Sequence, residues 1–204
     1  MKISLFRVFA FVCILLVCIT DNRPAQAESA STVVERFQAS LIKVMQSASE
    51  SSVRQRYDKL FPSVSDTFHL PLMTQIATGH HWSKAQPNEK AAVVAAFQRM
   101  NIATLATLFD GYNGEVFRIV SERPGPSNST IVLTNLIKSD KSKVKIAHVA
   151  RKFSGKWQLI DVVVDSGISE LKVRRSEYSM VLKNSGMPGL IKLLNDKANE
   201  LMSR

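Results

Sequence analysis

Residues 157–202, WQLIDVVVDSGISELKVRRSEYSMVLKNSGMPGLIKLLNDKANELM, are the stretch that decides the fold of this chain. The apolar-rich run 157–164 predicts a β-strand, and Ser166-Gly167 predicts the turn that ends it. The rest predicts two helices, 168–186 and 187–202, because apolar side chains recur there at helical spacing. Helices of this kind need an apolar partner, so the upstream chain must supply the surface on which they pack.

The N-terminus has the features of an export signal. Lys2 and Arg7 give it positive charge, residues 8–19 form an apolar run, and Ala25-Gln26-Ala27 is a small-residue cleavage site. The run is too short to cross a bilayer as a helix, which takes about 20 residues. We therefore expect residues 1–27 to be a signal peptide cleaved after Ala27.

Cysteine content and charge narrow the possible functions. Both cysteines, Cys13 and Cys18, precede the cleavage site, so the mature chain is expected to lack thiol catalysis, disulfides and cysteine-held metals. Removing three basic residues and one acidic residue with the signal lowers the net charge from +10 to +8. An exported protein is separated from the nucleic acid of the cell. The anionic partners expected for its positive charge are therefore lipid headgroups or an acidic protein. A generally solubilising surface explains the charge equally well.

The first half of the mature chain is predicted to be helical. Residues 28–49 form an amphipathic pattern with one buried face. Helical pattern resumes at 53–61, is expected to break at Pro62, and returns at 72–78. Residues 88–109 form the most apolar helix, which we expect to be buried on most sides.

The pattern then changes from helical to alternating. Four strands are predicted, at residues 115–121, 130–138, 143–153 and 157–164. Residues 123–129 contain two prolines and predict a loop, whereas Ser154-Gly155 predicts a two-residue hairpin turn. Short connections favour an antiparallel meander, so the chain is expected to be a single α+β domain. Its parts would be a helical region at 28–112, a sheet at 113–168 and covering helices at 169–204.

The third strand predicts which side of the sheet faces solvent. Alternate residues of a strand point to opposite faces. One side carries Lys143, Lys145 and Arg151, and the other carries Val144, Ile146, His148 and Ala150. We therefore expect one basic, solvated face and one apolar face covered by helices.

An ordered set of residues is typical of a known family. The set comprises Trp157-Gln158-Leu159-Ile160-Asp161-Val162, Gly167-Ile168-Ser169-Glu170-Leu171, Arg174-Arg175-Ser176-Glu177-Tyr178, Gly186 and Leu190-Ile191-Lys192-Leu193-Leu194. Upstream it continues with Phe61-Pro62, Leu72, Gly79-x-x-Trp82, Phe97 and Leu108-Phe109-x-x-Tyr112. Over about residues 30–202 the chain resembles the periplasmic lipid-binding proteins of the toluene-tolerance, or MlaC, family. The turn at 165–170 departs from the phospholipid-binding branch and favours the hopanoid-associated HpnM branch.

The resemblance implies both a fold and a function. The expected fold is a curved four-stranded antiparallel sheet covered on one face by helices, MlaC-like and related to NTF2-like folds. The expected function is a monomeric, non-enzymatic periplasmic carrier with no cofactor, which holds phospholipid or hopanoid tails as cargo. Expected partners are an inner-membrane transporter complex, an outer-membrane complex and, transiently, a membrane, with no nucleic acid. A carrier must shield its cargo, because exposing a 16-carbon tail to water costs roughly 13 kcal/mol.

Strand alternation and helical period select the candidate site residues. The predicted lipid-binding residues are Phe97, Leu105, Phe109, Tyr112, Ile119, Leu133, Ile146, Trp157, Ile160, Val162, Val164, Tyr178 and Leu182. The predicted docking residues for a partner or membrane are Lys143, Lys145, Arg151, Lys172, Arg174 and Arg175. The two C-terminal helices are interpreted as a lid, so alanine at Tyr178 or Leu182 is expected to lower lipid occupancy more than stability.

Two other functions remain open from the sequence. One is a non-enzymatic scaffold of the cell envelope that docks through its basic face. The other is a small-molecule enzyme, for which only His148 and Asp161 are candidate polar groups in the strands. No metal site is predicted, because adjacent residues such as His80 and His81 rarely face one ion.

Overall fold

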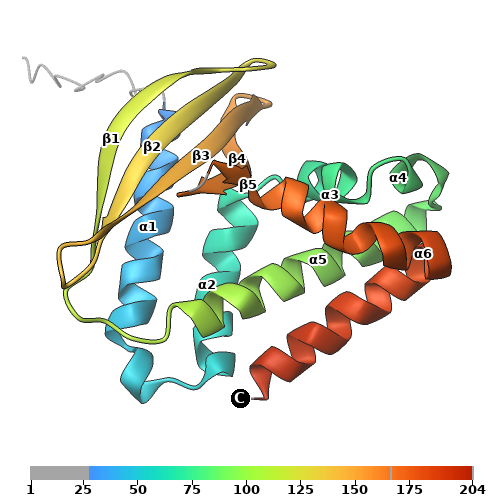
Figure 1. Cartoon of the computed structure of the whole chain (residues 1–204), viewed down its shortest axis with the longest axis horizontal. Coiled ribbons are helices and arrows are strands. Elements are labelled where there is room, and N and C mark those ends of the chain that lie inside the picture. The colour runs from blue at the N-terminus through green and yellow to red at the C-terminus, as the bar shows by residue number, and fades with distance from the viewer. Residues whose placement is uncertain (1–27, 166, 204) are drawn as a thin grey trace, which may run out of the picture.

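The structure, a computed structural model, describes residues 28–165 and 167–203, so the predicted signal peptide lies outside the described residues (Figure 1). The helices are α1 (Ala30–Gln46), the 3-10 turn η1 (Ala48–Glu50), α2 (Val53–Thr67), α3 (Leu70–Thr78), α4 (His81–Lys84), α5 (Pro87–Leu108) and α6 (Glu170–Met202). The strands are β1 (Val116–Gly125), β2 (Ser129–Ile137), β3 (Lys143–Phe153), β4 (Lys156–Val164) and β5 (Ile168–Ser169). The α+β class and the helix-then-sheet order are as predicted.

The sheet is an antiparallel meander in the order β1-β2-β3-β4-β5. Ser154 and Gly155 adopt φ values of 49° and 84°, so the predicted hairpin turn is confirmed. The prediction of four strands was wrong, because Ile168 and Ser169 add a fifth strand that pairs with β4. Two residues are too short a segment to show alternation, so only the fold reveals this strand.

Strand β1 is longer than predicted. It continues through Pro124 and Gly125, which pair with Thr130 and Ser129, so most of the predicted loop at 123–129 is strand. A proline has no N–H to donate, and β1 is an edge strand, where that donor is not required. The turn is confined to residues 126–128.

Helix α2 passes through the proline that was expected to end it. Pro62 lies inside the helix, which continues to Thr67. Its neighbours Leu60 and Val64 are fully buried in the core. Tertiary packing on both sides of Pro62 therefore outweighs the hydrogen bond that proline removes.

The helices share a core with one face of the sheet. The sheet curves over α1, while α2, α5 and α6 group beside it (Figure 1). Inside the interface, Gln38 Nε2 of α1 donates to Thr134 Oγ1 of β2 at 3.1 Å. One continuous cluster of buried side chains joins the layers and includes Val34, Phe37, Leu60, Phe97, Leu159 and Leu190. We call this side of the sheet the inner face.

Helix α5 is less enclosed than its composition predicts. Within the described part of the chain it is long and apolar enough to cross a membrane by length and composition. It packs against α2 and α6, and its buried residues include Phe97 and Ile102. Only six of its 22 residues are buried, and Leu108 at its end is 69% exposed, so the helix is not buried on most sides.

Helix α6 consists of the two predicted helices joined at a kink. Gly186 has φ 61° and ψ −161°, a conformation that interrupts the helix and favours glycine. The chain turns back on itself there, so the first half lies over α3 and the second half runs along α5 (Figure 1).

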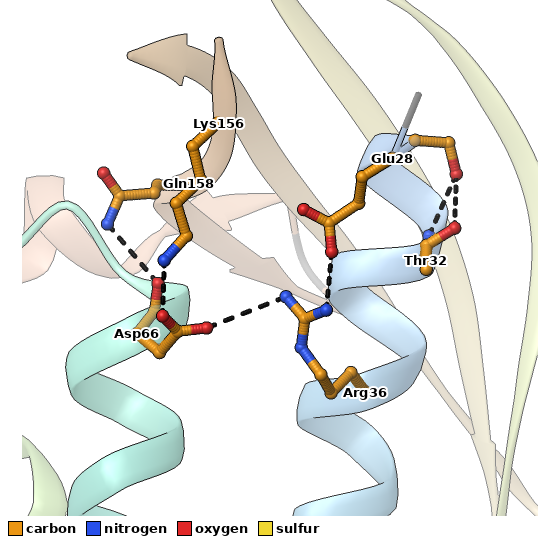
Figure 2. A network of polar contacts seen from close by, with 7 residues as sticks. Glu28, Thr32, Arg36, Asp66, Lys156 and Gln158 are labelled. Carbon is orange, nitrogen blue, oxygen red and sulfur yellow. Dashed lines mark hydrogen bonds and ion pairs between the residues drawn. The ribbon is translucent and has the colours of Figure 1, made fainter. Parts of the chain in front are cut away.

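A polar network joins α1, α2 and β4 at the surface (Figure 2). Arg36 contacts Glu28 at 2.5 Å and Asp66 at 3.7 Å, and Lys156 pairs with the same Asp66. Gln158 Nε2 donates to the Asp66 carbonyl oxygen at 3.4 Å. These side chains are about half exposed, so each ion pair contributes at most about 1 kcal/mol. The network fixes orientation more than it adds stability.

Candidate functional site

An apolar cavity of about 280 Å³ lies between the inner face of the sheet and the helices. Its helical wall consists of Phe37, Leu41, Val64, Leu70, Met73, Leu105 and Leu108, with Phe68 and Phe109 from the adjoining connections. Phe37, Leu41 and Val64 are almost fully buried, whereas Leu108 is exposed. The difference in exposure places the mouth of the cavity at the end of α5.

The sheet supplies the floor of the cavity through strand alternation. Ile146 pairs with Val164 and His148 pairs with Val162, so these four residues form two adjacent rows across β3 and β4. Phe117 of β1 also lines the cavity. The alternation predicted for β3 therefore describes this face correctly.

Five of the predicted lipid-binding residues line the cavity. They are Leu105, Phe109, Ile146, Val162 and Val164. The residues on β3 and β4 were predicted from strand alternation. The residues on and after α5 were predicted from the helical period. The structure brings them together from positions up to 59 residues apart in the sequence.

Three predicted residues lie in the packed core and do not line the cavity. Phe97 is 1% exposed, Tyr178 is 4% exposed and Leu182 is 3% exposed. Each belongs to the buried cluster that joins the helices to the sheet. The role of Tyr178 and Leu182 as lid residues over the cargo stays a prediction; in this structure both side chains belong to the core, and Leu182 also borders a separate hollow beside Gly79.

The other five predicted residues also lie outside the cavity. Tyr112 is exposed beyond α5, and Ile119 and Trp157 are partly buried against the core. Leu133 pairs with Ala147 on the opposite, outer face. Ile160 sits at a bulge in β4, between Leu159 and Asp161, where strict alternation breaks down.

The helical wall contains most of the cavity residues that sequence reasoning missed. Phe37, Leu41 and Val64 lie on predicted apolar helix faces. Helical period predicts such a face but does not distinguish the residues that border a void from those that touch side chains. No local signal marks them.

Four polar side chains also line the cavity wall. Asn101 Nδ2 donates to the Phe97 carbonyl at 2.7 Å, and Thr104 Oγ1 donates to the Met100 carbonyl at 2.9 Å. Glu170 and Arg174 come from the first turns of α6. Arg174 Nη1 pairs with Glu177 at 3.0 Å, and its side chain is only 20% exposed. A cation thus borders a mainly apolar cavity.

His148 is the buried polar residue of the floor. It is 3% exposed, and its Nδ1 has no hydrogen-bond partner among the described residues. Burial lowers the pKa of His148 to about 4, and the Val132 backbone opposes this only in part. The imidazole is therefore neutral at pH 7.

Asp161, the second candidate polar group, has a structural role. Its Oδ1 accepts from the backbone N–H of Val162 at 2.8 Å and of Leu171 at 3.2 Å, and its Oδ2 accepts from Ser169. These bonds fix the passage from β4 through β5 into α6. Asp161 and His148 do not meet in the cavity.

The histidines outside the cavity also have structural contacts. His69 Nδ1 accepts from the backbone N–H of Leu72 at 3.1 Å, and its ring stacks on Phe153. His80 and His81 lie beside each other, with ring centroids 4.0 Å apart. In residues 28–165 and 167–203, no three His, Cys, Asp or Glu side chains are grouped to hold a metal.

The predicted docking residues fall on two surfaces. Lys143 and Lys145 are exposed on the outer face of β3, where Arg151 is half-buried. Lys172, Arg174 and Arg175 lie at the start of α6. Of these, Arg174 lines the cavity and Arg175 packs against Gly79.

The outer face is more apolar than predicted. Leu133, Ala147 and Val163 lie side by side in register, and with Val120 they line an open hollow next to Lys145. The basic face was predicted from the third strand alone. Reading the alternation of all the strands together would have revealed this apolar row.

The fold and the cavity define an α+β protein whose curved antiparallel sheet and helices enclose an apolar site. The sequence profile of the MlaC protein family matches residues 35–196, and the chain belongs to this family. A similar solved structure is a phospholipid-binding protein from Ralstonia solanacearum in complex with a phospholipid. The match has a TM-score of 0.72 at 18% identity and covers 87% of this chain and 99% of that one. It establishes the similarity of fold.

Proposed function

We propose that this protein is a non-enzymatic lipid carrier that holds lipid tails in the cavity between the inner face and the helices. The observation that carries the proposal is the cavity itself, with its apolar walls and a mouth at Leu108, at the end of α5. Membership of the MlaC family and the phospholipid complex of the Ralstonia protein support it. An apolar site with few polar groups suits a hydrocarbon ligand.

The size of the cavity bears on how a lipid is held. A cavity of about 280 Å³ is slightly smaller than the pockets of about 300–1,000 Å³ that enclose drug-sized ligands. A complete lipid therefore requires the walls to move apart. The first half of α6 is the element best placed to move, since it borders the cavity and ends at the kink at Gly186.

The setting in which the carrier works is part of the same proposal. The N-terminal sequence favours export to the periplasm, with cleavage after Ala27. There the carrier would exchange its cargo with an inner-membrane transporter complex and an outer-membrane complex. The cargo is a phospholipid or, if the chain belongs to the HpnM branch, a hopanoid.

Native mass spectrometry of protein purified without detergent tests the proposal. We expect a population carrying lipid, which organic extraction then identifies as phospholipid or hopanoid. Substitution of Val162 by aspartate in the cavity floor should remove this population. Repeated recovery of lipid-free protein that also fails to take up lipid from vesicles would contradict the proposal.

The alternative is a scaffold of the cell envelope that docks through the outer face. It is favoured by the apolar row of Leu133, Ala147 and Val163 beside Lys145. A scaffold would bind an acidic partner in a salt-sensitive manner and carry no lipid. The mass-spectrometry experiment separates the two functions.

A further inference from the structure

His148 differs from every other polar residue of the cavity wall. Asn101 and Thr104 donate to carbonyl groups of their own helix, Arg174 pairs with Glu177, and Glu170 is exposed to solvent. In the described part of the chain, His148 Nδ1 has no partner, although the residue is 3% exposed. Buried polar atoms are nearly always hydrogen-bonded, and leaving one unpaired is costly.

The surroundings of His148 offer its ring few partners. The Val132 backbone lies close enough to oppose the lowering of the pKa by burial, but no group among the described residues forms a well-aligned hydrogen bond with Nδ1. Its neighbours on the floor are Ile146, Val162 and Val164, which are all aliphatic. The deep part of the facing helical wall consists of Phe37, Leu41 and other apolar side chains. The fold thus places one hydrogen-bonding atom on an otherwise apolar floor.

The protonation state defines what this atom can bind. Because burial lowers the pKa of His148 to about 4, the ring is neutral at pH 7 and has one N–H donor and one acceptor nitrogen. A neutral imidazole does not attract a phosphate by charge. It pairs instead with an uncharged oxygen, and a carbonyl accepts while a hydroxyl either accepts or donates.

We propose that His148 is a polar subsite in the cavity floor that hydrogen-bonds one uncharged oxygen atom of the lipid, an ester carbonyl or a hydroxyl. The proposal rests on the proposed lipid-carrier function and adds a chemical selectivity to it. A ligand that carries an oxygen at this depth satisfies Nδ1, whereas a purely hydrocarbon segment leaves it unpaired. Sites built to hydrogen-bond a ligand group reject analogues that lack it.

Two matched pairs of lipids distinguish the possible sources of the oxygen. The first pair is a diester phospholipid and the diether phospholipid with the same headgroup and chain length, which lacks the carbonyls. The second pair is a hydroxylated hopanoid and the corresponding hydrocarbon hopene. In competition for the wild-type protein, we expect the oxygen-bearing member of one pair to be preferred about fivefold. The pair that shows the preference identifies the oxygen.

Variants of His148 connect the preference to this residue. His148→Leu should bind both members of the discriminated pair equally while still retaining lipid. His148→Asn keeps a polar atom close to the position of Nδ1 and should retain the preference. If His148→Leu does not fold by circular dichroism, His148→Met provides the apolar side chain, since methionine adapts to irregular gaps.

The results of these experiments distinguish failure of the His148 subsite from failure of the proposed lipid-carrier function. A wild-type protein that binds lipid but shows no preference within either pair overturns the subsite, and so does a preference that persists in the apolar variant. A wild-type protein that takes up none of the four lipids overturns the proposed function itself. Preference in the wild type and in His148→Asn, but not in the apolar variant, supports the subsite.

Discussion

The inner face of the sheet presents Ile146, Val162 and Val164 to a cavity under the helices, whereas the outer face presents Leu133, Ala147 and Val163 to an open hollow. Val162, Val163 and Val164 are consecutive valines, yet alternation places the middle one on the opposite face. Composition therefore does not separate the two faces. Enclosure by helices distinguishes them, and enclosure is what shields an apolar ligand from water.

The largest expected effect is on stability, and it distinguishes residues of the packed core from residues that line the cavity. Leu190→Ala should lower the free energy of unfolding by about 3 kcal/mol, because Leu190 is fully buried in the core. Leu105→Ala should cost about 1 kcal/mol, since Leu105 already borders a void, but it should reduce lipid retention more. Urea unfolding and native mass spectrometry measure both quantities. If the two alanine variants lost the same free energy of unfolding, the distinction between core residues and cavity-wall residues would be contradicted.

The second effect is a pH dependence of the free energy of unfolding, which we expect from His148 on the inner face. The pKa of His148 is about 4 when folded against an ordinary 6.5, so the unfolded state binds more protons between these values. The free energy of unfolding should therefore fall as pH drops from about 6.5 to 4, by at most about 3 kcal/mol from this residue.

The matched control for this pH effect is His148→Asn, which does not titrate. Urea midpoints of both proteins at pH 7 and pH 4.5 isolate the contribution of His148 from that of the carboxylates. The wild type should lose more stability than the variant. An identical loss in both would show that His148 is not buried in its neutral form.

The third effect compares neighbouring valines on opposite faces. Val162→Asp places a charge in the apolar cavity and should lower lipid occupancy at least tenfold, because burying an unpaired carboxylate is strongly unfavourable. Val163→Asp places the same charge on the outer face and should change occupancy less than twofold. Lipid retention by native mass spectrometry reports both. The reverse order would place the ligand on the outer face.

The smallest effect concerns the charge of the outer face. Lys143→Glu should weaken binding to anionic vesicles about twofold at low salt and have no effect at high salt, because exposed charges are screened. Lys197→Glu, an exposed substitution on the second half of α6, is the control. Vesicle co-sedimentation measures both variants. An equal effect of the two substitutions would mean that net charge, and not the outer face, attracts the membrane.

Most of the fold was predictable from local pattern. The hairpin at Ser154-Gly155, the break at Gly186 and the facing of β3 each follow from a few adjacent residues. The failures have non-local causes. Helix α2 continues past Pro62 because Leu60 and Val64 pack on distant elements, and β5 exists only because β4 lies beside it.

The site was predictable only in part. The floor of the cavity follows from alternation in β3 and β4, as Ile146, Val162 and Val164 demonstrate. Phe97, Tyr178 and Leu182 have the same apolar character and helical spacing, but they fill the core. Nothing local distinguishes a side chain that borders a void from one that touches another side chain.

The sequence by itself determined the element types, their order, the two faces of the sheet and the family resemblance, because periodicity and turn chemistry act over a few residues. Only the tertiary structure decided which apolar residues enclose a cavity, that Tyr178 and Leu182 belong to the core, and that no group among the described residues pairs with His148 Nδ1. The physical reason is that a void or an unpaired atom depends on the separation of elements that are far apart in the chain. Adjacent residues carry no information about that separation.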